Sequence, residues 1–439
     1  MTFDLILREG RIAGRDRELV DIGVRDGRIA QIGPRLEMAD RPGARDVALN
    51  GRLLVPGFVE THIHLDKSCI SDRCTCRTGT LQEAIEGVAA AKRAFTEEDI
   101  YARARRTLEK AIVQGTTRMR CHVEVDPRIG LKGFRAIRIL KREYAWAIDI
   151  EICVFPQEGL NNDPGAFELL VEACESGADL IGGCPYTDSD PHGQIARIFD
   201  LARRFDIDID FHLDFDLDPS WMHLDEVCRQ TVAHKWGGRV AIGHVTKLSA
   251  LDVASLQHIG AKLSDAGVAV TVLPATDLFL MGRGQTHSVP RGVAPAHKLR
   301  GQGVICSLAT NNVLNPFTPF GDCSLIRMAN LYANIAQIGR PEELEACLDM
   351  VTVMPARLMN LTDYGIAVGN PADVVVLDCM DRASAVAELA QPILGVKRGR
   401  ISFSHPAAFL HRPEAETDTS FGEATILNAP GRLRDRALG

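Results

Sequence analysis

Eight short apolar segments in the middle of the chain constrain its fold most strongly. They are five to seven residues long and lie at residues 57–61, 117–123, 149–155, 179–183, 208–212, 240–244, 268–273 and 304–308. A continuous apolar run of this length is typical of a strand that is buried on both faces of a parallel sheet. The stretches between them carry apolar residues at helical spacing, as at residues 81–94, 97–113, 195–204 and 250–266. Alternating strand and helix patterns in this number predict an α/β fold, a (β/α)8 TIM barrel.

Strand patterns at both ends of the chain predict a second, smaller domain. Near the start they lie at residues 3–8, 20–24 and 28–32, and near the end at residues 372–377 and 393–396. Asp26 and Gly27 form a typical hairpin turn between two of them. We expect the two ends of the chain to pair with each other.

The length of the chain fits a division into two domains. A barrel of this type takes about 250 residues or more, and the chain has 439. We assign residues 56–359 to the barrel, and residues 1–55 together with 360–412 to a composite β-sandwich domain. Residues 413–439 are polar, which predicts a C-terminal extension outside both domains.

The charge and composition of the chain limit its partners. A formal net charge of −8 argues against a nucleic-acid partner, because binding to a phosphate backbone needs a basic face. The first residues do not resemble a leader peptide, and no run approaches the ~18 apolar residues of a membrane span. The twelve cysteines show no paired CxxC spacing, which is typical of reduced thiols. We therefore expect a cytoplasmic protein with a small-molecule partner and no membrane partner.

Four histidines lie at the carboxyl ends of three predicted strands, where barrels of this type carry their catalytic groups. His62 and His64 follow the first strand, and His212 and His244 end the fifth and the sixth. In an extended chain, residues i and i+2 point to the same side, so His62 and His64 can face one ion. A single histidine of this kind would be interpreted as a hydrogen-bonded core or surface residue. The four together favour a metal site.

Longer stretches of the sequence resemble a known family. They are residues 56–68, which contain the pattern His-x-His-x-Asp-Lys-Ser, and residues 155–159, 178–183 and 363–373. These stretches resemble the amidohydrolase superfamily, in particular its cytosine deaminases and the N-isopropylammelide hydrolases. The resemblance covers nearly the whole chain and implies the same barrel fold.

The resemblance also implies roles for individual residues. It implies metal ligation by His62, His64 and His212, a substrate or water contact from His244, and a contact between Gln157 and a ring amide. Three neutral imidazoles bind one divalent ion, Zn or Fe, and leave a position where a water molecule becomes reactive at neutral pH. Cys184, after the fourth strand, stands where two-metal relatives carry a carboxylated lysine, which favours a single ion.

The chain departs from the cytosine deaminase pattern at two positions. Phe215 stands where the fifth strand of that family carries a proton-transferring glutamate, and Asn311 stands where the eighth strand ends in a metal-binding aspartate. An amide can accept a coordination bond or orient water, but it cannot act as a general base. Phe215 makes that side of the pocket apolar. This favours a substrate with an alkyl or aryl group and argues against cytosine itself.

Lys67 and His244 are the leading candidates to transfer protons in place of the missing acids, with Asp214 as a third. A lysine near a cation can have a lowered pKa. In the alternative interpretation, Lys67 only forms an ion pair with Asp66 or Asp214, and Asp214 points to a neighbouring loop. Arg283, in a loop after the seventh strand, can reach an anionic or carbonyl group of the substrate or simply belong to a solvated loop.

These observations predict a metal-dependent hydrolase that cleaves a C–N bond of a nitrogen heterocycle or cyclic amide, by deamination or by removal of an amine. The alternative is a ligand-binding or regulatory protein that has kept the fold and lost the chemistry, because of Phe215 and Asn311. A linear amide or carbamate substrate is also left open. Relatives often assemble, so a homo-oligomer is open as well.

Overall fold

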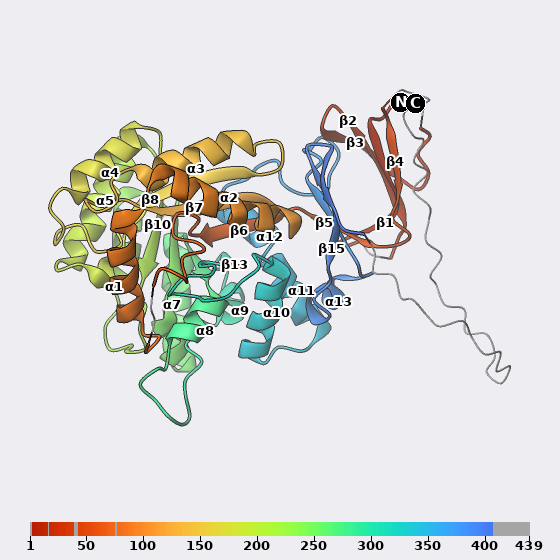
Figure 1. Ribbon diagram of the computed structural model, residues 1–439. Coiled ribbons are helices and arrows are strands. Elements are labelled where there is room, and N and C mark those ends of the chain that lie inside the picture. The colour runs from red at the N-terminus through yellow and green to blue at the C-terminus, as the bar shows by residue number, and fades with distance from the viewer. Residues whose placement is uncertain (1, 16, 39–42, 75–76, 407–439) are drawn as a thin grey trace, which may run out of the picture.

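The computed structural model describes residues 2–15, 17–38, 43–74 and 77–406. The predicted extension at residues 413–439 lies outside the described residues, as does the end of the predicted small domain. The described chain forms a barrel and a smaller β domain beside it (Figure 1). No helix among the described residues is long and apolar enough to cross a membrane.

Eight parallel strands form the wall of the barrel and follow one another in chain order. They are β6 (Phe58–Ile63), β7 (Thr116–Glu124), β8 (Asp149–Phe155), β9 (Leu180–Ile181), β10 (Asp208–Leu213), β11 (Val240–His244), β12 (Val268–Val272) and β13 (Cys306–Leu308). A parallel bridge between Ile63 and Asn311 joins β6 to the chain that follows β13. The predicted barrel is confirmed, with a strand at each of the eight predicted segments.

Helices pack around the barrel wall (Figure 1). They are α1 (Leu81–Ala91), α2 (Glu97–Val113), α3 (Lys132–Glu143), α4 (Ala166–Glu175), α5 (Pro191–Phe205), α6 (Leu224–His234), α7 (Val253–Ala266), α8 (Pro274–Leu280), α9 (Ala296–Arg300), α10 (Leu325–Ala336), α11 (Pro341–Asp349) and α12 (Val353–Leu358). Of these, α1 and α8 lie next to the residues at the mouth of the barrel. Short 3-10 turns are η1 (Lys92–Ala94), η2 (Pro185–Thr187) and η3 (Thr246–Ala250). In α2, the Thr96 side chain caps the first turn by accepting a hydrogen bond from the Asp99 backbone N–H. One face of α2, which includes Ala104 and Leu108, is buried against the wall.

The smaller domain is built from both ends of the described chain. Its strands are β1 (Leu5–Ile12), β2 (Val20–Arg25), β3 (Arg28–Gly33), β4 (Arg45–Ala48), β5 (Leu53–Pro56), β14 (Val374–Leu377), β15 (Pro392–Lys397) and β16 (Arg400–Ser404), with helix α13 (Arg382–Ala387) beside them. The predicted pairing of the two ends is confirmed, because β5 runs antiparallel to β14. An apolar cluster that includes Leu7, Ile22, Leu54 and Val376 forms its core. The sequence did not predict β4, β5 or β16.

The carboxyl ends of the barrel strands bring the polar residues of the site together. Three of the residues there have left-handed backbone angles, with φ 48° at Asp214, 70° at His244 and 64° at Asn311. Such angles are unfavourable for residues with a side chain and persist only where the surrounding structure enforces them. At Asn311 two backbone hydrogen bonds do so: its N–H donates to the His62 carbonyl at 2.8 Å, and its carbonyl accepts from the His64 N–H at 2.9 Å.

Candidate metal centre

Three buried imidazoles meet at the mouth of the barrel. His62 and His64 come from β6 and its end, and His212 comes from β10. The Nε2 atom of His212 lies 3.0 Å from Nε2 of His62 and 3.1 Å from Nε2 of His64. Burial is the first cause that lowers the pKa of all three imidazoles well below the ordinary value, so they are neutral at pH 7.

The three imidazoles fit a divalent ion. Neutral imidazole nitrogens carry lone pairs, and the distances from the His212 nitrogen to those of His62 and His64 are near those expected for nitrogens that share one ion at about 2.1 Å. The three Nδ1 atoms have no hydrogen-bond partner among the described residues. The donor set therefore suits Zn²⁺ or Fe²⁺ and leaves a further coordination position for a water molecule or a ligand.

His244 stands beside this cluster, and its partner is a residue that the sequence analysis missed. Its Nδ1 atom lies 2.7 Å from Oδ1 of Asp277, on α8, and both side chains are buried. Burial raises the pKa of the Asp277 carboxyl above its ordinary range, although the contact with His244 opposes the shift. Ligand nitrogens of His62, His212 and His244 lie within 4.8 Å of one another. The sequence offered one indication of Asp277, which is its position shortly after the seventh predicted strand.

Lys67 faces the same cavity, held by two side chains. Its Nζ atom donates to Oε1 of Glu124 at 2.6 Å and to Oε1 of Gln157 at 3.1 Å. The alternative in which Lys67 pairs with Asp66 or Asp214 is wrong, because Glu124 at the end of β7 is its ionic partner. Asp66 instead accepts hydrogen bonds from the backbone N–H groups of Lys67 and Glu124.

A second buried lysine stands behind Glu124. Lys92 donates to Oε2 of Glu124 at 2.8 Å, to Asp126 at 2.6 Å and to Glu158 at 2.6 Å. Burial opposes ionisation of Glu124, but the ammonium groups of Lys67 and Lys92 lower its pKa to about 2. The carboxylates of Glu124, Asp126 and Glu158 are close enough to hold a metal ion. The Lys92 ammonium already binds all three, so this cluster is a site for that ammonium.

A further buried group lies beneath the imidazoles. The ring of His122, on β7, lies 3.7 Å from the ring of His62 between centroids. His62, His122 and Asp210 form another group that could hold a metal ion. Asp210, however, accepts a hydrogen bond from the Arg120 guanidinium at 2.8 Å, and this ion pair makes it a weaker ligand than the free imidazoles above.

Phe215 and Asn311 occupy the positions of the two acids that the resemblance would supply. The Phe215 ring stacks on the His244 ring at 3.7 Å between centroids and 25° between planes. The Asn311 side chain is 1% exposed, and neither atom of its amide has a hydrogen-bond partner among the described residues. The amide is therefore available to a ligand, because a buried polar group without a partner is costly.

These groups surround a small cavity. Its lining residues are His64, Lys67, Gln157, Tyr186, His212, Phe215, His244, Asn311, Asn312 and Phe317. Most of the residues singled out in the sequence are therefore brought together, including both residues expected to contact substrate through an amide, Gln157 and Asn311.

Three residues singled out in the sequence are not among the lining residues. One is His62, whose Nε2 atom lies 3.0 Å from that of His212, which does line the cavity. The Asp214 carboxylate accepts hydrogen bonds from the backbone N–H groups of His223 and Leu224, at the start of α6. It therefore fixes the helix after β10. Arg283 is exposed, donates to the Phe279 carbonyl at 2.8 Å and lies over the Phe279 ring. The loop that carries Arg283 does not bring it to the cavity.

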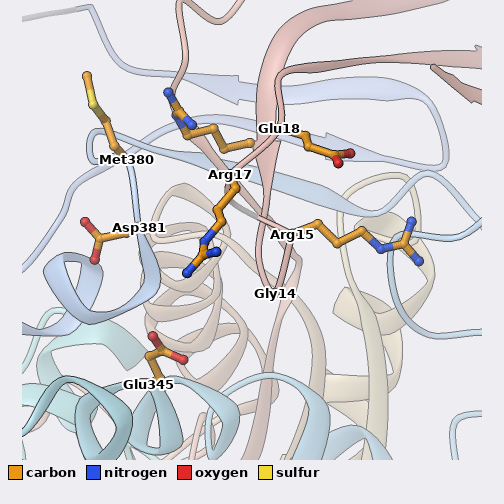
Figure 2. A pocket seen from close by; sticks show the side chains of 8 residues that line it. Gly14, Arg15, Arg17, Glu18, Glu345, Met380 and Asp381 are labelled. Atoms are coloured by element: carbon orange, nitrogen blue, oxygen red, sulfur yellow. The ribbon is translucent and has the colours of Figure 1, made fainter. Parts of the chain in front are cut away.

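A larger hollow, of about 1170 Å³, lies between the small domain and the outer helices α11 and α13 (Figure 2). Its lining residues are Arg11, Gly14, Arg15, Arg17, Glu18, Glu345, Met380 and Asp381. None of these lining residues is an imidazole or a thiol, and the hollow is open to solvent. The smaller cavity holds the chemically competent groups despite its size.

Comparisons with known proteins agree with this arrangement. Residues 134–403 match the amidohydrolase family. N-isopropylammelide isopropyl amidohydrolase of Pseudomonas sp. (strain ADP) is 27% identical over 409 residues, which cover 91% of this chain and 97% of that protein. Pterin deaminase of Rhizobium rhizogenes is 28% identical over 370 residues, 81% of each chain. The crystal structure of 5-methylcytosine deaminase from Klebsiella pneumoniae liganded with 5-fluorocytosine has a TM-score of 0.88 at 28% identity, and the match covers 93% of this chain and 99% of that chain. Because the family match spans more than half of the sequence, the chain belongs to the amidohydrolase family.

Proposed function

We propose that this protein is a metal-dependent hydrolase that cleaves a C–N bond of a small nitrogen heterocycle, releasing ammonia or an amine. The observation that carries the proposal is the meeting of the His62, His64 and His212 Nε2 atoms, 3.0 and 3.1 Å apart, at a cavity of the barrel mouth. The names of the relatives point to the same reaction class, since they include an isopropyl amidohydrolase and two deaminases.

We assign metal binding to His62, His64 and His212, with Asn311 facing the same space. A Zn²⁺ or Fe²⁺ ion held by these residues would supply Lewis acidity, which would lower the pKa of a water molecule enough for attack on a ring carbon at neutral pH. The reaction adds this water to the ring carbon and breaks the C–N bond, so the departing nitrogen must receive a proton.

His244 and Lys67 are the groups that we assign to charge stabilisation and proton transfer. The ionised Asp277 carboxylate accepts from Nδ1–H of His244 at 2.7 Å, which directs Nε2 of the ring to the cavity. Nε2 can then take a proton from the attacking water and return it to the leaving nitrogen. Lys67 keeps one N–H direction free of Glu124 and Gln157, and this N–H can donate to a developing negative charge.

Gln157, Asn311 and Phe215 position the substrate in this proposal. Gln157 is oriented by Lys67 on one side and by the Cys184 thiol on the other, at 3.4 Å. Asn311 presents an unused amide, which pairs with the lactam edge of a ring. Phe215 closes the side on which cytosine deaminases carry an acid, and this argues against cytosine as the substrate.

A second candidate function is binding without turnover. The lining residues of the cavity include no carboxylate, and the titratable groups among them, besides His64 and His212, are His244, Lys67 and Tyr186. A protein that recognises a heterocycle without converting it would retain the same cavity.

Metal analysis and a substrate screen separate the two candidates. Purified protein is loaded with Zn²⁺ or Fe²⁺ and assayed for release of ammonia or amine from pyrimidines, triazines, pterins, cyclic ureas, linear amides and carbamates. One ion per chain with turnover, both abolished in His212→Ala and retained in the surface variant His258→Ala, supports the hydrolase. Ligand binding without turnover supports the second candidate, and a chain that binds no divalent ion contradicts the metal-dependent proposal.

A further inference from the structure

The wall of the cavity has an unusual charge for a site that handles neutral heterocycles. None of its ten lining residues is an acid, whereas one of them, Lys67, is a cation. The three imidazoles bring no negative charge, so these side chains would not neutralise any of the charge of a divalent ion that they bound. In a ligand set with an aspartate, part of that charge would be neutralised by the protein.

The acids behind the wall are not among the lining residues, and each is engaged by other groups of the protein. Glu124 lies between the ammonium groups of Lys67 and Lys92, at 2.6 and 2.8 Å. Asp277 is bound to His244. Asp66 accepts two backbone hydrogen bonds, at 2.9 Å each.

Two further features describe the ligand that fits this wall. The Asn311 amide offers one donor and one acceptor side by side, which complements the N–H and C=O of a lactam or imide edge. Phe215 and Phe317 add aromatic surface, and the Lys67 ammonium lies 4.5 Å from the centre of the Phe317 ring. A flat ring suits a space between such surfaces.

We propose that the site selects a small planar heterocycle that is anionic at pH 7, with the charge delocalised over the ring and its carbonyl oxygens, and that Lys67 and the metal site recognise this charge. This inference takes the class of ligand, a nitrogen heterocycle, from the proposed function. It adds that the ligand is ionised when it binds. Asn311 in place of an aspartate is then a specificity-determining residue: a carboxylate there would repel the anion.

Binding of a matched pair of rings tests the inference without turnover. Barbiturate and uracil have the same ring and similar size, but barbiturate is ionised at pH 7 and uracil is neutral. Their affinities for the full-length, zinc-loaded protein are measured by isothermal titration calorimetry at constant ionic strength. We expect barbiturate to bind at least about tenfold more tightly, because an ion pair in a dry cavity is weakly screened. A ratio below tenfold, or no binding of barbiturate at millimolar concentration, overturns the inference.

Variants assign the preference to the named groups. We expect Asn311→Asp to weaken barbiturate binding more than uracil binding, because both rings lose the amide N–H and only barbiturate is repelled by the carboxylate. We expect Lys67→Met to lower the ratio of the two affinities. Lys262→Met removes a charge at the surface of α7 and is the matched control, for which the ratio stays at the wild-type value. Orotate, a neutral ring with an external carboxylate, shows where the charge is recognised: binding weaker than that of barbiturate supports a ring anion, and tighter binding contradicts it. A preference for anions without turnover of any heterocycle refutes the proposed hydrolysis but not this inference.

Discussion

Asp277 holds the His244 imidazole from behind, with its Oδ1 atom 2.7 Å from Nδ1, while Phe215 stacks on the face of the same ring. A second oxygen of Asp277 accepts from the Leu273 backbone N–H at 3.2 Å, which fixes the carboxylate itself. These contacts leave Nε2 of His244 as the one ring nitrogen that can exchange a proton with a ligand.

Asp277→Asn is expected to lower kcat by about 10²–10⁴-fold, because an amide can present its N–H to Nδ1 and stabilise the wrong tautomer of His244. KM is expected to change little, since Asp277 does not line the cavity. The measurement is kcat and KM on a heterocycle identified by the screen, with the exposed Asp265→Asn as control. An unchanged kcat would remove His244 from the proton-transfer step.

Loading with Zn²⁺ is expected to raise the melting temperature of the protein, because an ion that binds only the folded chain stabilises it by about 2.7 kcal/mol at a free concentration of 100 Kd. Chelation should reverse the shift. Differential scanning calorimetry of wild type and of His62→Ala, with and without Zn²⁺, measures the effect, and His258→Ala is the control. A shift of equal size in His62→Ala would place the ion elsewhere.

Asn311→Asp is expected to bind Zn²⁺ about tenfold more tightly than wild type, because the exchange adds an anionic oxygen beside the imidazoles at almost no change in shape. Asn312→Asp is the matched control, since Asn312 lines the same cavity and is bonded to Asn315 at 2.6 Å. Competition with a chromogenic chelator gives the affinities. An equal gain in both variants would indicate a general effect of charge without ligation by residue 311. If turnover appears only after Asn311→Asp is combined with Phe215→Glu, the wild-type protein is a binding protein.

Glu124→Gln is expected to destabilise the metal-free protein by about 3–5 kcal/mol, because it leaves the buried ammonium groups of Lys67 and Lys92 without their shared carboxylate. Glu109→Gln, on the exposed face of α2, is the control and should cost less than about 1 kcal/mol, since the Glu109 pair with Arg105 is exposed to solvent. Urea unfolding followed by fluorescence measures both variants. Equal losses would mean that the buried network contributes no more than a surface ion pair.

Glu158 is expected to make stability fall as the pH rises from about 4.5 to about 7. Burial, together with the charge of Glu124, raises the pKa of Glu158 to about 7, although Lys92 opposes the shift. Between the two pKa values the folded protein holds a proton that the unfolded chain has lost, so unfolding becomes easier as the pH rises. Asp126 and Arg128 also face Glu158.

The measurement is the free energy of unfolding at several pH values for wild type and Glu158→Gln. The difference in the free energy of unfolding between the two proteins should change from about pH 4.5 to about pH 7 and become constant above about pH 8. At that pH Glu158 is ionised in both the folded and the unfolded wild-type protein. Parallel curves across the whole range would contradict the raised pKa.

The barrel could be predicted from the sequence because its strands are buried on both faces and read as apolar runs. Segments without that signature were missed. Most side chains of β4 are exposed and β16 is only partly buried, so neither shows an apolar run, and β5 runs directly into β6 with only Gly57 between them. The pattern of apolar residues therefore predicted the strands of the barrel better than those of the small domain.

The histidines were found because their positions relative to the strands are local, whereas their partners come from distant segments. Lys92 and Glu124 are 32 residues apart, and His244 and Asp277 are 33 residues apart. No spacing in the sequence indicates such pairs. Alternation along an extended chain left open whether Asp214 faces the cluster or a neighbouring loop. The backbone at Asp214 is left-handed, and its carboxylate lies at the start of α6.

The hydrogen bonds that join Asn311 to His62 and His64 close the ring of strands and hold the imidazole cluster at the same time. The barrel closes and the imidazole cluster forms in the same step. A nascent chain that ends before residue 311 can therefore have neither the closed barrel nor the cluster. For the same reason, a circularly permuted protein can have its new termini in other connections between strands. New termini beside residue 311 would disrupt both the closure of the barrel and the imidazole cluster.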